Sequence, residues 1–512
     1  MLAVVNDTYN ASEVLDRNLE EGRGDKTAYV APDATLSYDA LRRQVNRAGR
    51  LLRQLGVDRE DRVLLVLDDT TVFPIAFLGA IRIGAVPVPV SPLDKDDNFR
   101  HFVTDSCARV VVCDPARLEV LRETLAGHDL QFVTRGVDDV VEVDGALAAQ
   151  DDELDPAPTH RDDMAFWLYS SGSTGKPKGV VHLQHDIAVT CESFAGGVLG
   201  ISEDDRIFST TKLYHAYGLG NALSFPLHFG ATAVLLDGPP KPERLLATLR
   251  DQRPTVYCSV PALYAVLASH PDADAALESV RVCVSAAEPL PPATFDRWRE
   301  RFGLEIVDGI GSTEMLHIYC SNRPGEVVRG TTGRPVPGYE LRLVDDDGEV
   351  LDGAAVGNLE VRGDSCAAFY WHQHEKTKRC MRGDWFASGD RYERHADGTY
   401  AYVGRSDDML KIGGLWVSPI DMESVLIEHP AVAGLGVVGT TVDGQSRIAA
   451  FIELADGVRG DEQLADELRA WCKHRMRRYE YPHVVRFVDA LPRTLTGKVQ
   501  RFKLREHARE GK

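Results

Sequence analysis

The sequence predicts an α/β protein with a large N-terminal domain, made of two α/β lobes and a β-rich subdomain, and a small mobile α+β C-terminal domain. Its 512 residues are too many for one ordinary domain. Short runs of β-branched residues alternate with amphipathic stretches, which is the pattern of parallel sheets covered by helices. From about residue 330 the strands become shorter and Asp-Gly turns separate them. We therefore expect residues 1–404 to form the N-terminal domain and residues 405–512 the C-terminal domain.

The first lobe is predicted from alternating helical and extended segments. Residues 38–55 place apolar side chains at helical spacing with arginines between them, and residues 73–83 are typical of a second helix. The apolar runs at 62–67 and 109–114 predict buried strands. Residues 85–90, AVPVPV, are expected to be extended because each proline fixes φ and lacks an N–H.

A connector and a second set of strands follow. The acidic, proline-containing residues 150–163 predict a loop. Farther along the chain, Asp-Gly turns within residues 346–350 and 396–400 are typical of hairpins. Further strands are predicted at residues 232–237, 255–260 and 280–286.

Charge and cysteine usage narrow the class of protein. The chain has 58 Lys+Arg against 78 Asp+Glu, a formal net charge of −20, which argues against a general nucleic-acid binder but not against a local site for ATP or coenzyme A. The nine cysteines are scattered without a Cys-x-x-Cys pair, which indicates reduced thiols rather than disulfides or a zinc site. We see no signal peptide and no apolar run of roughly 20 residues. A soluble, cytoplasmic protein is expected.

The string YSSGSTGKPKG, residues 169–179, has the composition of a polyphosphate-binding loop. Its glycines permit close backbone approach, its hydroxyl groups can donate hydrogen bonds, and its lysines supply positive charge. It is not a Walker loop, because Lys176 is followed by Pro177 rather than by Ser or Thr. The residues expected to bind the nucleotide here are Ser171, Gly172, Ser173, Thr174, Gly175, Lys176 and Lys178.

This string resembles the phosphate loop of the adenylate-forming superfamily, which includes acyl-CoA synthetases, peptide-synthetase adenylation domains and firefly luciferase. The resemblance spans nearly the whole chain. It implies that ATP and a carboxylic acid form acyl-AMP and pyrophosphate, and that a thiol then takes the acyl group. Magnesium is expected, because a hard cation is needed to screen the phosphate charge while the carboxylate attacks.

Two further motifs extend the resemblance. GIGSTE, residues 309–314, looks like the segment that lines the acyl and adenine sites, which implies that Thr313 lies near the phosphate and that Glu314 helps to hold Mg²⁺. SGD, residues 388–390, resembles the ribose-binding motif, which makes Asp390 the residue that accepts from the ribose hydroxyls.

The C-terminal motifs resemble the moving parts of the family. GRSDDMLKIGG, residues 404–414, looks like the hinge between the large and small domains. It implies that Arg405 reaches the nucleotide, that Asp407 is the pivot, and that Gly413 and Gly414 face the site after rotation.

PRTLTGKVQR, residues 492–501, contains the last motif, in which Lys498 matches the catalytic lysine of the family. The chemistry requires a cation there, because two anions approach and the α-phosphorus gains charge in the transition state.

Other segments look like the benzoate-type aryl-CoA ligases. These are KLYHAYGLGN (212–221), GIGSTEMLHIY (309–319), DRNLEEGRGDK (16–26) and GLWVSP (414–419). A pocket with Tyr and Ile walls and glycine floors suits the plane of an aromatic acid. The resemblance implies that the acid pocket is lined by Ala216, Tyr217, Gly309, Gly311, His317 and Ile318.

The identity of the acid is narrowed further at Tyr214 and His215. Relatives that activate amino acids place an aspartate near this point, and an ammonium without such a partner would be costly to bury. An α-amino acid is therefore not expected. We favour His215 as an aromatic gate of the thiol tunnel, with a role beside a polar ring substituent as the alternative.

The thiol acceptor is expected to be a separate molecule, because no phosphopantetheine-attachment domain follows Lys512. Coenzyme A is favoured over a free-standing carrier protein by the aryl-CoA ligase motifs. Two alternatives stay open: an aryl-acid adenylating enzyme that loads a carrier protein, and a P-loop-like nucleotide-binding NTPase. Monomer and homodimer are both compatible with the sequence, and no interaction with nucleic acid or membrane is expected.

Overall fold

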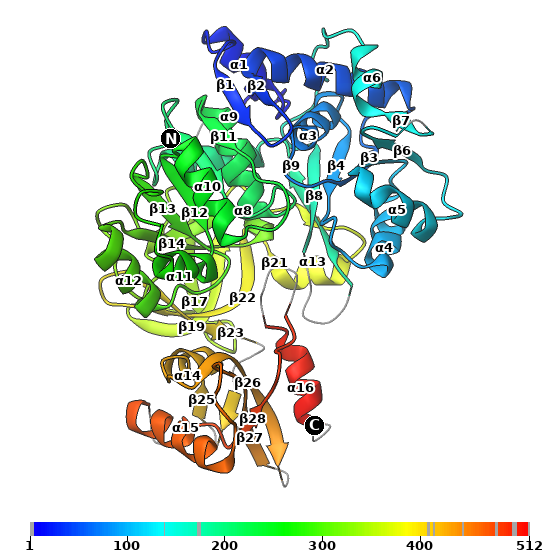
Figure 1. Ribbon diagram of the computed structural model, residues 1–512. Helices are drawn as coiled ribbons and strands as arrows, with labels where there is room; N and C mark the ends of the chain where they lie inside the picture. Colours follow the sequence, from blue (N-terminus) through cyan, green and yellow to red (C-terminus); the bar gives the residue numbers. More distant parts are fainter. Residues whose placement is uncertain are drawn as a thin grey trace. The chain divides into compact units, whose positions relative to one another are not determined.

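Two compact units make up the chain in the computed structural model, which describes residues 5–137, 139–170, 176–406, 410–412, 415–442, 445–476, 480–493 and 499–509. The first unit contains Met1–Leu341 and Val361–Phe386, and the second contains Arg342–Glu360 and Ala387–Lys512 (Figure 1). Helices and strands alternate through both, so the predicted α/β class is confirmed.

The first lobe of unit 1 is built on a parallel five-stranded sheet in the order β4-β3-β5-β6-β7. The proline-containing strand β4 lies at its edge, where a missing N–H costs least. The strands are β3 (Arg62–Val66), β4 (Val86–Pro89), β5 (Val110–Cys113), β6 (Gln131–Thr134) and β7 (Val141–Glu142). The helices are α2 (Tyr38–Gln54), α3 (Val72–Arg82), α4 (Asp96–Ser106), α5 (Leu118–Thr124) and α6 (Val143–Ala148), with a 3₁₀ turn η1 (Pro115–Arg117).

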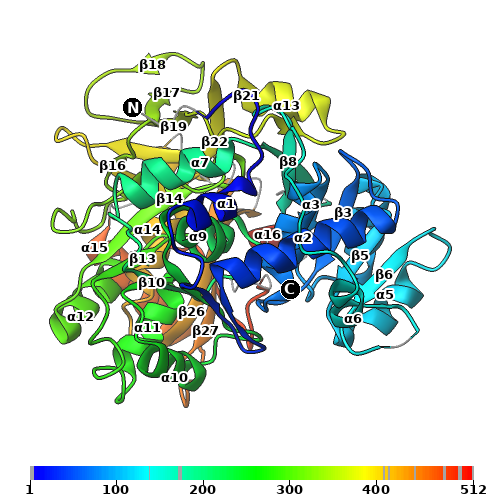
Figure 2. The same ribbon diagram turned by 90° about the horizontal axis from the view of Figure 1, so that it is seen from above.

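Helices α2 and α3 lie side by side in both views because small residues let their backbones approach (Figures 1 and 2). A Cβ added to Gly79 would lie 2.7 Å from the Cβ of Ala48, and one added to Gly49 would lie 3.2 Å from the Gly79 carbonyl oxygen. Larger side chains at these positions would therefore separate the two helices.

The second lobe contains a nine-stranded sheet in the order β16-β15-β14-β13-β12-β10-β11-β1-β2. Its strands are β1 (Thr27–Val30), β2 (Thr35–Ser37), β10 (Arg206–Ser209), β11 (Thr232–Val234), β12 (Val256–Ser259), β13 (Val282–Ser285), β14 (Ile306–Gly311), β15 (Ile318–Ser321) and β16 (Arg334–Pro335). Its helices are α1 (Glu13–Glu20), α7 (Asp186–Thr190), α8 (Ala216–Leu219), α9 (Phe225–Phe229), α10 (Pro242–Gln252), α11 (Pro261–Ser269) and α12 (Pro292–Phe302). The π-helical segments η2 (Cys191–Gly196) and η3 (Gly220–Ser224) continue α7 and α8, and a 3₁₀ turn, η4 (Thr313–Met315), follows β14.

A three-stranded antiparallel sheet, β20-β9-β8, completes unit 1. Its elements are β8 (Met164–Ser170), β9 (Lys178–Leu183) and β20 (Phe369–Tyr370), followed by α13 (His374–Cys380) and β21 (Met381–Arg382). The side chains of Trp167 and Val181 join the core of the first lobe, with Phe99 and Phe102 of α4. The second lobe has its own core around Tyr257, Tyr264 and Trp298.

The second unit begins in a β-rich sheet, in which β18, β17, β19 and β22 are neighbours in that order and β23 pairs with β22. These strands are β17 (Glu340–Val344), β18 (Val350–Leu351), β19 (Ala355–Arg362), β22 (Trp385–Arg394) and β23 (Tyr400–Arg405). The α+β part that follows consists of β24 (Leu410–Ile412), β25 (Leu415–Val417), α14 (Pro419–Leu426), β26 (Val432–Val442), β27 (Gln445–Leu454), α15 (Glu462–Arg475), β28 (Val484–Phe487) and α16 (Arg501–Arg509).

Candidate active site

The phosphate-loop string lies at the tip of a hairpin. Strands β8 and β9 pair antiparallel, with Tyr169 opposite Gly179 and Ser170 opposite Lys178. The strand predicted before the string is therefore present. Lys176 is exposed. Ser171–Gly175, the five residues expected to hold phosphate through hydroxyl groups and backbone, lie outside the described residues and stay a prediction.

Lys178 and Glu314 form a buried ion pair, although 136 positions separate them. Lys178 Nζ lies 2.7 Å from Glu314 Oε1, and the Tyr370 hydroxyl donates to the same oxygen over 2.8 Å. The ammonium also lies 4.0 Å from the centre of the Tyr370 ring. Burial alone would raise the pKa of Glu314, but Lys178 and the hydrogen bonds outweigh it, and the pKa is lowered. Glu314 is therefore a carboxylate.

The turn that carries Thr313 and Glu314 is fixed from several sides. Ser312 caps it, because its Oγ accepts from the Met315 N–H over 3.2 Å. His182 Nε2 donates to the Thr313 carbonyl over 2.8 Å, and His182 Nδ1 lies 2.7 Å from Asp186 Oδ2. The side chains of His182 and Asp186 are fully buried. Thr313 and Glu314 thus keep one backbone geometry.

An aromatic box surrounds His317, three residues after Glu314. The centre of its ring lies 5.5 Å from that of Tyr217, 5.2 Å from Phe194 and 4.6 Å from Phe225. Burial lowers the pKa of His317 to about 3, so the imidazole is neutral. Neither ring nitrogen makes a hydrogen bond of ordinary geometry within the described part of the chain. The structure brings Tyr217 and His317 together, as the predicted acid pocket requires.

Glycine makes room for this box in a π-helical segment. A Cβ added to Gly220 would lie 2.4 Å from His317 Cδ2. Phe194 and Phe225 lie within or directly beside π-helical turns, η2 and η3, and such turns are frequent at functional sites. The sequence analysis missed both phenylalanines, because an apolar residue in a helical stretch carries no signal that separates a pocket from a core.

The other predicted pocket residues lie on elements that meet here. Ala216 begins α8, and His215 precedes it with an extended backbone and with its ring 4.7 Å from that of Tyr214. Gly309 and Gly311 lie on β14. A Cβ added to either would come within 3 Å of strand β15 or its connection, at the Ile318 side chain and the His317 carbonyl respectively. Close strand packing is thus sufficient to require both glycines.

Asp308, directly before Gly309 on β14, is a buried carboxyl group that the sequence analysis did not single out. Its side chain is buried, and its Oδ1 has no hydrogen-bond partner among the described residues. Burial raises the pKa of Asp308 well above its ordinary value, although Ser285 opposes the shift. A protonated carboxyl can both donate and accept a hydrogen bond.

In the second unit, Asp390 and Arg405 meet across the β22–β23 pair. Arg405 Nη1 lies 3.2 Å from Asp390 Oδ1 and donates to the Ser388 carbonyl over 3.2 Å. Gly389 has φ +76°, and a Cβ there would lie 2.7 Å from Arg405 Nη2, so only glycine suits this position. The structure thus pairs two residues that the sequence assigned separately to the nucleotide.

Four other predicted residues, Asp407, Gly413, Gly414 and Lys498, lie outside the described residues, and their roles stay predictions.

All nine cysteines are free thiols. Within the described part of the chain, no group of three or more His, Cys, Asp and Glu residues is placed to hold a metal ion. No helix in the same part combines the length and apolar character that a membrane crossing requires.

Comparisons with known proteins cover nearly the whole chain. Residues 15–371 match the family "AMP-binding enzyme", and residues 421–498 match the "AMP-binding enzyme C-terminal domain". The chain is 45% identical over 504 residues to benzoate–CoA ligase of Thauera aromatica, covering 97% of this chain and 96% of the relative. It is 43% identical over 509 residues to 4-hydroxybenzoate–CoA/benzoate–CoA ligase of Rhodopseudomonas palustris, covering 97% and 94%.

Solved structures agree in fold. A benzoate CoA ligase from Burkholderia xenovorans LB400 superimposes with a TM-score of 0.90 at 42% identity, over 97% of this chain and 100% of the other. The anthranilate CoA ligase AuaEII in complex with anthranoyl-AMP gives a TM-score of 0.93 at 37% identity, over 99% and 98%.

Proposed function

Because the chain belongs to the family of AMP-binding enzymes, we propose that it is an ATP-dependent benzoate–CoA ligase. Benzoate or a substituted benzoate attacks the α-phosphorus of ATP, which gives aryl-AMP and releases pyrophosphate. The thiol of coenzyme A then attacks the acyl carbon, which gives aryl-CoA and releases AMP.

The observation that carries the proposal is the short segment from Glu314 to His317. One end places a carboxylate on the buried ammonium of Lys178, and the other places a neutral imidazole in a box of aromatic rings. A charged phosphate end and an apolar ring end are thus only three residues apart. A small aromatic acid beside a nucleotide would need an apolar pocket next to a few charged or polar groups, and this segment offers both.

Magnesium fits this arrangement as the ion that would accompany ATP. Mg²⁺ is commonly held by one or two carboxylates together with substrate phosphates, and Glu314 is an ionised carboxylate. Because this carboxylate already lies beside the Lys178 ammonium, we propose that Glu314 would help to hold the cation. The bound ion would screen the phosphate charge while the carboxylate attacks, and Thr313 would lie beside the phosphate.

The nucleotide and the transition state engage several other residues in this proposal. The hydroxyl and amide groups of Ser171–Gly175 hold the β- and γ-phosphates, with Lys176 near them, and Asp390 accepts from the ribose with Arg405 beside it. Lys498 directs its ammonium at the α-phosphorus, where charge builds up.

We further propose that the two half-reactions use different positions of the C-terminal domain, residues 405–512. Rotation at Asp407 would withdraw Lys498, bring Gly413 and Gly414 to face the site and open a path for the thiol. His215 would gate that path. The aromatic acid would lie against Tyr217 and His317, with Ala216, Gly309, Gly311 and Ile318 around it.

Coenzyme A is preferred over a carrier protein as the thiol acceptor, because the relatives at 45% and 43% identity are both CoA ligases. The test is pyrophosphate release by the purified protein with ATP and Mg²⁺, with and without benzoate, followed by addition of coenzyme A. Benzoate-dependent pyrophosphate and then benzoyl-CoA are expected. Benzoate-independent ADP would favour the NTPase alternative, and adenylate that coenzyme A does not consume would favour a carrier protein.

A further inference from the structure

Helix α4 presents two polar side chains to the hairpin that carries the phosphate loop. His101 and Asp105 are four residues apart on this helix, so they lie on one face, a single turn from each other. Neither residue was singled out by the sequence. Each contacts a different strand end of the β8–β9 hairpin.

Asp105 contacts the hairpin at the end of strand β8. Its Oδ2 accepts from the Tyr169 hydroxyl over 2.8 Å, and the Tyr169 ring packs 4.6 Å from the ring of Phe102 on the same helix. Burial, with Asp105, raises the pKa of Tyr169, so the phenol keeps the proton that it donates. The backbone carbonyl of Asp105 accepts from Trp371 Nε1 over 2.9 Å, and Trp371 directly follows β20, the strand that pairs with β9.

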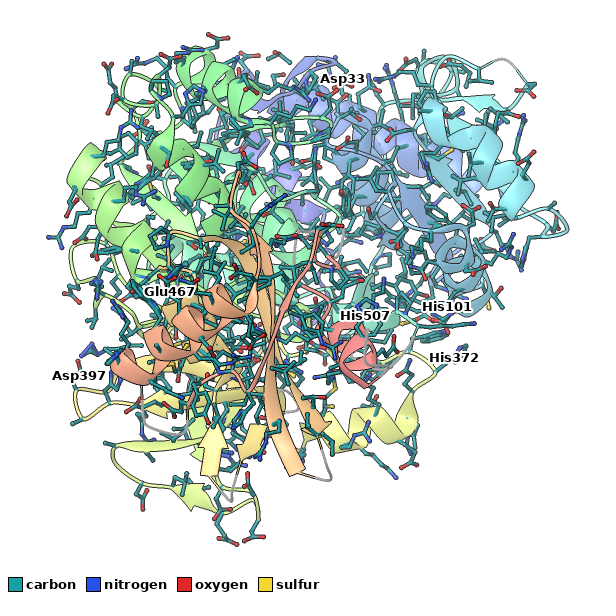
Figure 3. The ribbon with its side chains drawn as sticks, turned by 60° about the horizontal axis from the view of Figure 1, so that its bottom comes forward. Asp33, His101, His372, Asp397, Glu467 and His507 are labelled. Atoms are coloured by element: carbon teal, nitrogen blue, oxygen red, sulfur yellow. The ribbon has the colours of Figure 1, made fainter. Side chains whose placement is uncertain are left out.

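His101 contacts the hairpin directly before the start of strand β9. Its Nε2 lies 2.7 Å from the Pro177 carbonyl oxygen, which can only accept, so Nε2 carries the proton. Pro177 directly precedes Lys178, whose ammonium reaches Glu314. His101 also lies edge-on to Tyr169, with ring centres 5.9 Å apart. His372 Nδ1 lies 3.4 Å from Asp105 Oδ1. Figure 3 labels His101 and His372, the two histidines of this cluster.

We propose that His101 and Asp105 are positioning residues for nucleotide binding, because they fix both ends of the connection 171–177 on one helix. This inference rests on the proposed function, in which that connection binds ATP. The connection is longer than the two to five residues of most hairpin loops, so contacts at its two ends help to set its position. On the β9 side, His101 adds to the β20–β9 pairing and the Lys178–Glu314 ion pair; on the β8 side, Asp105 adds to the β8–β9 pairing. Fixing the two ends in advance lowers the ordering cost that ATP binding must overcome.

The test compares variants that remove each contact with variants that keep it. His101→Ala and Asp105→Ala should each raise the KM for ATP by about 3- to 10-fold, the effect of one lost hydrogen bond, and leave the KM for benzoate within about 2-fold. His101→Gln keeps a side-chain N–H and Asp105→Asn keeps an acceptor, so both should recover most of the affinity for ATP. His128→Ala, at an exposed histidine of the same lobe, is the matched control and should change neither constant.

The experiments distinguish an error in the positioning role of His101 and Asp105 from an error in the proposed ligase function. Wild-type protein that forms no benzoyl-AMP contradicts the function. Active wild-type protein whose two alanine variants keep the wild-type KM for ATP, or lose affinity equally for ATP and benzoate, overturns the positioning role. If the alanine variants do not fold, Tyr169→Phe, which removes only a hydroxyl, decides: an unchanged KM for ATP overturns the role, and a raised one supports it.

Discussion

At the scale of single residues, the pair Lys178–Glu314 combines burial with opposite charge, and each partner depends on the other. Lys178→Met leaves the Glu314 carboxylate buried without its cation, which should cost about 3–5 kcal/mol of unfolding free energy. Urea unfolding at pH 7 measures this loss. Lys176→Met, at an exposed lysine two residues away, should cost less than about 0.5 kcal/mol. Equal effects of the two substitutions would contradict the buried pair.

The buried side chain of Asp69 makes the free energy of unfolding depend on pH. Burial raises its pKa to about 7, against the opposing effects of Lys212 and the Leu213 N–H. Between about pH 4 and pH 7 the folded state keeps a proton that the unfolded state has released, so this residue lowers stability as pH rises. Asp69→Asn removes this ionisable group and, with it, its pH-dependent contribution to the free energy of unfolding. The stability of the variant relative to wild type should therefore increase by about 2 kcal/mol or more from pH 5 to pH 8.

Urea unfolding of both proteins at several pH values checks this expectation. Asp129→Asn changes an exposed carboxylate in the same lobe and should give a flat difference across the range. If the difference in unfolding free energy between Asp69→Asn and wild type is also independent of pH, the folded protein does not hold this proton.

Local sequence predicted roles for Glu314 and His317 but not the side chains that contact them. Their roles came from one short motif, whereas Lys178, Phe194 and Phe225 come from segments more than 80 positions away. Lys178 was expected to serve phosphate, and its contact with Glu314 depends on how the hairpin packs against the turn after β14. Such contacts are set by tertiary packing, which no periodicity records.

At the scale of elements, the π-helical segment η3 begins at Gly220, which lies against the His317 ring. Gly220→Ala would place a methyl group 2.4 Å from His317 Cδ2, and overpacking of this kind costs about 1–3 kcal/mol. We expect the KM for benzoate to rise several-fold while the KM for ATP stays near wild type. Steady-state kinetics with each substrate varied in turn measures the split.

Gly24→Ala is the control for that substitution, because its nearest neighbour to an added Cβ lies at an ordinary 3.7 Å. It should leave both constants unchanged. An unchanged KM for benzoate in Gly220→Ala would remove His317 from the acid pocket.

Most strands and the first helices could be predicted, because their patterns are local. The run at 62–67 became β3, residues 38–55 became α2, and the prolines of 85–90 lie on an edge strand as their missing N–H groups demand. The π-helical segments could not be predicted, because helical periodicity does not distinguish a single π turn from the α-helix in which it occurs. The order of strands in the nine-stranded sheet could not be predicted either, because it depends on pairing between segments that are far apart in the sequence.

At the scale of the whole molecule, the proposed reaction divides between two chemical steps. Lys498→Ala should slow the formation of benzoyl-AMP by orders of magnitude, because a cation at the α-phosphorus is lost. It should still convert preformed benzoyl-AMP and coenzyme A to benzoyl-CoA. Single-turnover assays of each step measure the difference, and equal damage to both would refute the division of labour.

Oxygen transfer from the acid to AMP tests the central claim most directly. With benzoate labelled by ¹⁸O in its carboxylate, attack on the α-phosphorus places one labelled oxygen between the acyl carbon and phosphorus, and thiol attack at the carbon leaves it on AMP. Mass spectrometry of the products should find AMP with one ¹⁸O for each benzoyl-CoA formed. AMP without label, or ADP in place of AMP, would contradict an acyl-adenylate pathway.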